Sequence, residues 1–291
     1  MYWEVKLRGK LFVLIFSLVF LTIFFISCGP SAPKNTLEKV LQKKRIYVAV
    51  HPVNPPFEFG SGVGIDGFDK DVMENIAKEL GVKVIWIKKS FDECFKVLKD
   101  GDADCVINAL TITPERKKEF DFSIPYYETG QMIAVRKERD DIKDVKDLEG
   151  KKVGVQKDST AEAFLKKLNS DGKITIVTYD SFDDALFELN RKLVDAVVGD
   201  APTLLYESKE LRNIKVVGKL LTHEKYGIAF RKGDVEIRNK INSILRKLKS
   251  SGVIEELVKK WGLNYNPEES ADRSGESTPQ KGSEGNSESG K

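Results

Sequence analysis

Two segments of the chain repeat one pattern at a constant offset. Residues 90–93 (SFDE) precede a helical stretch that leads to the apolar run 103–107, and residues 181–184 (SFDD) lead in the same way to 194–198. In each copy a serine can cap the helix, with an acidic residue three positions later, as in a capping box. The copies align without a gap. A chance similarity of two helix–strand units is the alternative, and we interpret the repeat as two similar α/β lobes.

Strand-like and helix-like segments alternate through the rest of the chain. Apolar residues of 69–80 recur on one helical face, with Gly81 as the stop, and residues 235–261 read as two amphipathic helices broken at Gly252. This alternation predicts parallel sheets covered by helices. The expected strands are 45–50, 82–87, 104–108 and 153–155, and the other expected helices are 91–99 and 161–168.

The N-terminus is typical of an export signal. Positive residues precede a short apolar run over 11–26, which ends at a small residue before Cys28. The segment resembles a lipoprotein signal, with Phe25 in place of the usual leucine. We expect a signal peptide over 1–27, a lipidated Cys28, a linker over 28–40, and a protein anchored to the extracytoplasmic (periplasmic) face of a membrane. A retained membrane helix is the alternative, although the run is shorter than the roughly 20 residues of a span.

The composition excludes some partners. The net charge is +3 with acids and bases interleaved, and no basic stripe alternates with aromatic residues, so a nucleic-acid partner is not expected. The two histidines and three cysteines show no metal-ligand spacing. Residues 266–291 are nearly devoid of apolar side chains, and we expect a disordered tail.

The repeat also predicts where a ligand binds. Ligands of open α/β sheets bind beyond the carboxyl ends of the strands, and the equivalent strands end at Asn108 and Gly199. Arg116 lies beyond the first strand and Asp200 follows the second. A guanidinium matches a carboxylate and a carboxylate matches an ammonium, so this pair suits a free amino acid. The alternative is that Arg116 belongs to the charged run 115–119 and is solvated.

A second helix start offers further polar groups. Ser159 and Thr160 follow the strand at 153–155 and precede a helical run, where free backbone amides favour an anion. Ordinary helix capping is the commoner use of Ser and Thr at such a position.

Motifs across the mature chain resemble one family, the bacterial periplasmic binding proteins for polar amino acids, family 3. The resemblance covers about 45–263. The matching stretches are 55–59 (PPFEF), 67–69 (GFD) with Asp71, 90–92 (SFD), 111–116 (TITPER), 120–123 (FDFS) with 125–127 (PYY), 148–151 (LEGK), 194–197 (VDAV), 226–229 (YGIA) and Trp261.

The resemblance implies a two-lobe α/β fold of the type II, or Venus-flytrap, class, with two parallel-rich sheets and a two-strand hinge. It implies crossovers near 131–135 and 226–229, which give a first lobe of 41–132 plus 226–265 and a second lobe of 133–225. It also implies a monomer without a cofactor, which delivers a small polar L-amino acid to an ABC transporter permease.

By the same resemblance, Arg116 takes the ligand carboxylate and Asp200 the ammonium. Phe91 is similar to the aromatic wall of the pocket, Ala109 and Thr111 supply backbone and hydroxyl contacts, and Thr160 joins from the second lobe.

Three positions depart from the family pattern at the side-chain end of the pocket. His51 stands where members often have Asp, Asn54 where they have an aromatic residue, and Gln156 where some glutamine-binding members carry Lys. With Phe91, these residues favour a neutral polar or acidic ligand side chain. A lone histidine is also often structural.

An enzyme is the competing interpretation, because a few relatives are periplasmic dehydratases of prephenate or arogenate. That reaction needs a general acid, and the sequence places no unassigned carboxylate in the cleft. A receptor sensor domain would need a membrane span after Trp261, where the sequence is polar.

Cys94 and Cys105 fall on the helix and the strand of one repeat unit. If both side chains face the interface between them, export permits a disulfide; two buried free thiols are the alternative.

Overall fold

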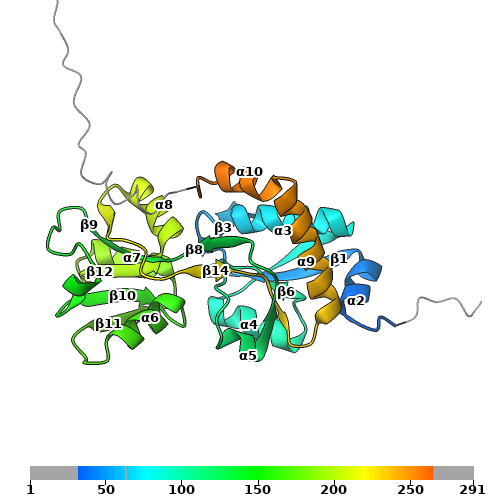
Figure 1. The fold of residues 1–291 in the computed structure, drawn as a ribbon, viewed down its shortest axis with the longest axis horizontal. Helices are drawn as coiled ribbons and strands as arrows, with labels where there is room; N and C mark the ends of the chain where they lie inside the picture. Colours follow the sequence, from blue (N-terminus) through cyan, green and yellow to red (C-terminus); the bar gives the residue numbers. More distant parts are fainter. Residues whose placement is uncertain (1–31, 63, 265–291) are drawn as a thin grey trace, which may run out of the picture.

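The computed structural model describes residues 32–62 and 64–264. The predicted signal peptide, the lipidated Cys28 and the predicted disordered tail lie outside the described residues. The described chain forms two α/β lobes, each built on a five-stranded sheet, joined side by side (Figure 1). None of the described helices is both long enough and apolar enough to cross a bilayer.

The first lobe has a mixed sheet in the order β5-β1-β6-β15-β7. β1 is parallel to β5 and β6, whereas β15 runs antiparallel to β6 and β7. The strands are β1 (Arg45–Val50), β5 (Lys83–Lys88), β6 (Cys105–Val106), β7 (Phe120–Phe122) and β15 (Ala229–Arg231).

Helices cover both faces of this sheet. α2 (Thr36–Lys43), α3 (Phe68–Leu80), α9 (Val235–Ser250) and α10 (Val253–Lys260) pack on one face, and α4 (Phe91–Asp100) packs on the other. The short α5 (Arg116–Glu119) leads into β7. The predicted break between α9 and α10 is confirmed, since Gly252 has φ +81°, a conformation that favours glycine.

The second lobe repeats this design in the order β11-β10-β12-β9-β13. The strands are β9 (Gln131–Arg136), β10 (Lys152–Gln156), β11 (Thr175–Tyr179), β12 (Ala196–Asp200) and β13 (Ile214–Val217). α7 (Phe182–Asn190) and α8 (Ala201–Leu211) pack on one face, with α6 (Thr160–Leu168) and η1 (Val145–Leu148) on the other. α4–β6 and α7–β12 occupy equivalent places in the two lobes, which confirms the repeat.

Two antiparallel strands connect the lobes. β8 (Tyr127–Thr129) pairs with β14 (Glu224–Tyr226) in the hinge between the two sheets (Figure 1). The first crossing comes slightly earlier than the expected 131–135, because β9 already belongs to the second sheet, and the second crossing, at β14, overlaps the start of the expected 226–229. A small three-stranded sheet of β2 (Val53–Asn54), β3 (Glu58–Ser61) and β4 (Gly64–Asp66) lies beside the hinge on the first lobe.

The expected linker over 28–40 is wrong for its last residues. α2 begins at Thr36, Asn35 caps it by accepting a hydrogen bond from the Glu38 amide at 2.9 Å, and Val40 is fully buried. The amphipathic pattern of α2 covers only eight residues, which is too short to predict a helix after a polar linker segment.

The two described cysteines form no disulfide. Cys94 packs with α4 against one face of the first sheet, whereas Cys105 packs with the core on the opposite face. The free-thiol alternative is therefore the correct one. Burial raises the pKa of the Cys94 thiol to about 12, so it is unreactive in the folded protein.

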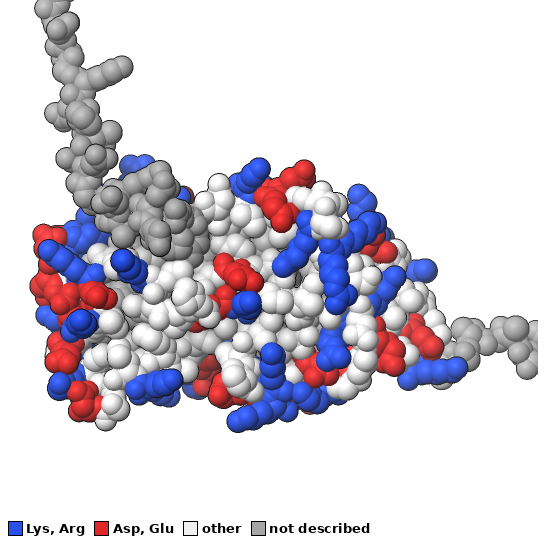
Figure 2. Space-filling view, viewed as in Figure 1, with Lys and Arg blue, Asp and Glu red and all other residues white. Residues whose placement is uncertain are grey.

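The visible surface carries both signs of charge. Figure 2 shows basic and acidic side chains interspersed over this face, with uncharged surface between them.

Candidate functional site

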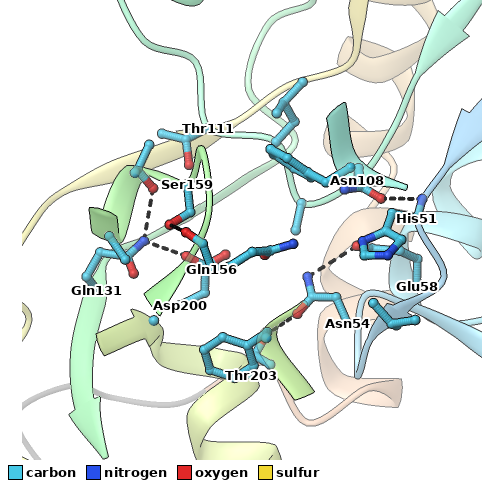
Figure 3. A pocket seen from close by; sticks show the side chains of 18 of the residues that line it. His51, Asn54, Glu58, Asn108, Thr111, Gln131, Gln156, Ser159, Asp200 and Thr203 are labelled. Carbon is cyan, nitrogen blue, oxygen red and sulfur yellow. Dashed lines mark hydrogen bonds between the residues drawn. The ribbon is translucent and has the colours of Figure 1, made fainter. Parts of the chain in front are cut away.

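One pocket between the lobes contains all of the residues predicted to bind the ligand (Figure 3). Its volume is about 590 Å³, including the part that is open to solvent. The first lobe contributes His51, Asn54, Phe91, Asn108, Ala109, Thr111 and Arg116, and the second lobe contributes Gln156, Ser159, Thr160 and Asp200.

Arg116 is held in the pocket by contacts with both lobes. It opens α5, where the Thr113 hydroxyl accepts a hydrogen bond from its amide at 3.1 Å. Its guanidinium donates to the carbonyl of Thr111 at 3.0 Å and, across the cleft, to that of Asp158 at 3.2 Å. The guanidinium carbon lies 5.6 Å from the centre of the Phe91 ring. Arg116 is therefore a positioned cation, and the solvated alternative does not hold.

Asp200 presents a half-buried carboxylate from the second lobe. Its oxygens accept hydrogen bonds from the Gln131 amide and the Tyr226 hydroxyl. Burial and the nearby charge of Glu224 raise the pKa of Asp200 to about 7, while both hydrogen bonds and Arg116 act in the opposite direction. A ligand ammonium would favour the ionised form of this group.

A carboxylate that the sequence did not assign lies under the pocket. Glu224, on hinge strand β14, accepts hydrogen bonds from the hydroxyls of Thr111 and Thr160 at 2.5 and 3.0 Å, and from Thr222 and Gln131 at 2.9 and 3.0 Å. The hydroxyls of Thr111 and Thr160 were expected to face the ligand. In the structure both donate to Glu224 on the hinge strand instead. Glu224 belongs to no sequence motif that would mark it as a site residue. It reaches the site because hinge strand β14 passes beneath the pocket.

The far end of the pocket is polar. The Thr203 hydroxyl donates across the cleft to Asn54 Oδ1 at 2.7 Å, and Asn54 Nδ2 donates to Glu58 Oε1 at 3.2 Å (Figure 3). Asn108 Oδ1 accepts from the His51 amide at 2.7 Å. Burial lowers the pKa of His51, with Asp92 acting against it, so the imidazole is neutral at pH 7. Glu58 and Thr203 were missed by the sequence analysis.

Two phenylalanines line the pocket from equivalent positions. Phe91 opens α4 and Phe182 opens α7, one in each lobe. The repeat contained the signal that would have identified Phe182. Gly199 makes room for it, because a Cβ there would lie 2.0 Å from the Phe182 ring.

Ser159 serves mainly as a helix cap. Its hydroxyl accepts from the Glu162 amide at 3.2 Å and donates to the Gln156 carbonyl at 2.6 Å. The Ser159 hydroxyl therefore caps α6, as the alternative interpretation proposed, although the residue also lines the pocket. Ala109 lines the opposite wall with φ +44°, and its amide donates to buried Asp69 at 2.7 Å.

The geometry agrees with comparisons to known proteins. Residues 46–264 match the bacterial extracellular solute-binding proteins, family 3. A glutamine-binding protein of an ABC transporter from Bacillus subtilis (strain 168) is 32% identical over 272 residues, which cover 87% of this chain and 97% of that protein.

Solved structures are similar across both lobes. An ancestral arginine-binding protein bound to arginine is 42% identical with a TM-score of 0.72, covering 75% of this chain and 98% of that one. An ancestral amino acid-binding protein, a precursor of cyclohexadienyl dehydratase, is 37% identical with a TM-score of 0.73, covering 78% and 99%.

Proposed function

The chain belongs to the bacterial extracellular solute-binding proteins, family 3, and we propose on that premise that it binds a free L-amino acid between its lobes for an ABC transporter. One observation carries the proposal. Arg116 and Asp200 line the same pocket with opposite charges, and they come from different lobes.

The two charges suit the backbone groups of an amino acid. The Arg116 guanidinium offers a fork of donors to the ligand carboxylate, and Asp200 offers a half-buried carboxylate to the ammonium. A buried charge is costly without a partner, so a zwitterion satisfies both residues together.

The far end of the pocket supports a ligand side chain that donates hydrogen bonds. Asn54, Thr203 and Gln156 are neutral, and Glu58 can accept. The buried carboxyl groups of Glu58 and Asp69 disfavour an acidic ligand side chain. Of the two classes expected from the sequence, neutral polar and acidic, the structure therefore favours the neutral polar one. Relatives that bind glutamine and arginine support this class of ligand.

A thermal-shift panel of the twenty L-amino acids tests the proposal. A bound ligand stabilises the protein by RT ln(1 + [L]/Kd), about 2.7 kcal/mol at a hundredfold excess over Kd. We expect a member with a hydrogen-bonding side chain to raise the melting temperature. Agmatine, which keeps the guanidinium of arginine but lacks its carboxylate, is the control and should have no effect. No shift from any amino acid would refute binding.

Delivery to a permease implies an extracytoplasmic protein, and lipidation of Cys28 would keep it at the membrane. Cys28→Ser should abolish labelling with a radioactive fatty acid and release or misprocess the protein. Labelling that persists in the variant would exclude Cys28 as the anchor.

The enzyme alternative gains one observation from the structure. Glu58 lines the pocket, and burial raises its pKa well above the usual range, with Asp69 next in effect, so the cleft holds a carboxyl group suited to act as a general acid. Prephenate has no ammonium and would leave Asp200 unpaired, which argues against prephenate, whereas arogenate is an amino acid that could pair with it. An assay with prephenate and arogenate should show no turnover; product formation above background would establish the dehydratase.

A further inference from the structure

Two buried carboxyl groups lie close together beside the far end of the pocket, where Glu58 lines the wall and Asp69 does not reach the lining. Glu58 on β3 is 1% exposed and Asp69 on α3 is fully buried, and the two groups are within hydrogen-bonding reach of each other. Glu58 Oε1 accepts from Asn54, and Asp69 Oδ2 accepts from the Ala109 amide. The other oxygens, Glu58 Oε2 and Asp69 Oδ1, are buried and have no geometric hydrogen-bond partner among the described residues, although the buried Tyr126 hydroxyl lies close to Asp69.

This arrangement requires a proton. Two ionised carboxylates carry only acceptors and like charge, so they repel strongly where water cannot reach them. One proton between them removes a charge and converts the contact into an O–H···O hydrogen bond, as in other paired carboxyl groups. Burial raises the pKa of Asp69 to about 6 and that of Glu58 well above its usual range.

Within residues 32–62 and 64–264, the charged and titratable groups around Glu58 supply no cation. Asp200 at the end of β12 adds negative charge, the Cys94 thiol on α4 and the Tyr126 hydroxyl are buried, and the His51 imidazole nearby in the pocket is neutral. A positive charge that enters the far end of the pocket must therefore come with the ligand.

We propose that Glu58 and Asp69 share one proton, and that an amino acid with a cationic side chain displaces this proton when it binds. The inference rests on the proposed function. The Glu58 O–H bond breaks, the proton leaves to solvent, and the Glu58 carboxylate pairs with the ligand cation. A neutral ligand side chain leaves the proton in place and meets a carboxyl group that can donate or accept.

One pocket then accepts both kinds of side chain, and pH sets its preference. Binding that releases a proton strengthens as the pH rises, by about tenfold per pH unit while the free site is protonated and the bound site is not. The affinity for a cationic ligand should rise in this way relative to that for its neutral isostere. Any proton released by Asp200 when it meets the ligand ammonium is common to both ligands and cancels in the comparison.

Isothermal titration calorimetry of the full chain with L-arginine and L-citrulline tests the proposal. The two ligands differ in charge but hardly in shape. Titrations at pH 7 in buffers of different ionisation enthalpy count the protons released by each. We expect arginine to release about one proton more than citrulline. Equal proton counts would overturn the proposal, as would a protein that binds only one of the two.

Two substitutions test whether the released proton comes from Glu58. Glu58→Gln should abolish the difference between the ligands and weaken arginine binding more than citrulline binding. The exposed Glu74→Gln, also on the first lobe, should keep the difference; a difference that persists in Glu58→Gln contradicts the assignment. If neither ligand binds while another amino acid raises the melting temperature, the inference fails and the proposed function stands. If no amino acid binds, both fail.

Discussion

Arg116 holds its guanidinium in the pocket through contacts that another cation cannot reproduce. The planar group donates to the Thr111 and Asp158 carbonyls and lies over the Phe91 ring. Arg116→Ala should weaken amino-acid binding by about 2–5 kcal/mol, because the ligand carboxylate is left buried without a partner. Arg116→Lys should not restore it, since an ammonium lacks the fork of donors.

Calorimetry with the best ligand of the panel measures both effects. The exposed Arg191, which pairs with Glu188 on the second lobe, provides the control, and Arg191→Ala should bind normally. Full binding by Arg116→Lys would show that a point charge suffices.

In the ligand-free protein, the ionised Asp200 carboxylate should lower the free energy of unfolding. Its pKa is raised to about 7 from 3.8, so the folded state holds the proton more tightly than the unfolded state. Between these values the contribution of Asp200 to stability falls as the pH rises, and well above pH 7 its loss is complete. Asp200→Asn should thus be more stable than wild type at pH 8, by about 1 kcal/mol or more, yet bind amino acids weakly.

Thermal unfolding from pH 4 to pH 8 checks this prediction. The gap between variant and wild type should grow up to about pH 7 and then stay constant. A gap that is independent of pH would mean that ionisation of Asp200 does not limit stability.

The sequence predicted the residues that lie beside strand ends or helix starts, and missed those that reach the pocket by other routes. Arg116 and Asp200 follow equivalent strands of the repeat, so their positions could be inferred. Glu58 and Thr203 reach the pocket from a small sheet and from the body of a helix, where no local pattern marks them. Glu224 depends on where the chain crosses between lobes, which is a property of the tertiary fold.

At the scale of elements, the hinge depends on the close approach of two backbones. Gly130 lies between β8 and β9, and a Cβ there would lie 1.9 Å from the carbonyl oxygen of Thr222, just before β14. Gly130→Ala must push the two hinge segments apart and should destabilise the protein by about 1–3 kcal/mol.

Gly60→Ala is the matched control in the first lobe. A Cβ at this position would meet its nearest neighbour at 4.0 Å, so its effect on stability should be small. Chemical unfolding of both variants measures the difference, and equal stabilities would show that the hinge tolerates the added methyl group.

The main alternation of strands and helices could be predicted because apolar periodicity is strong in long segments. The residues at which individual strands and helices begin and end could not be predicted. The expected strand over 104–108 is reduced to β6 (Cys105–Val106), since the residues beyond it turn into the pocket loop. α2 and the three-stranded sheet of β2, β3 and β4 are short and were not predicted.

At the scale of the molecule, few direct hydrogen bonds connect the lobes across the cleft. Among the described residues, Thr203 donates to Asn54, and Arg116 donates to the Asp158 carbonyl. A ligand that meets Arg116 and Asp200 together adds charged contacts that only the closed arrangement offers. Such differential affinity shifts the population towards the closed state.

Small-angle X-ray scattering, with and without a saturating amino acid, measures this closure directly. The ligand should lower the radius of gyration of the wild-type protein. Asp200→Ala should weaken binding and compaction together, because one lobe loses its contact with the ligand. Identical wild-type scattering curves with and without bound amino acid would contradict the claim that the ligand joins the two lobes.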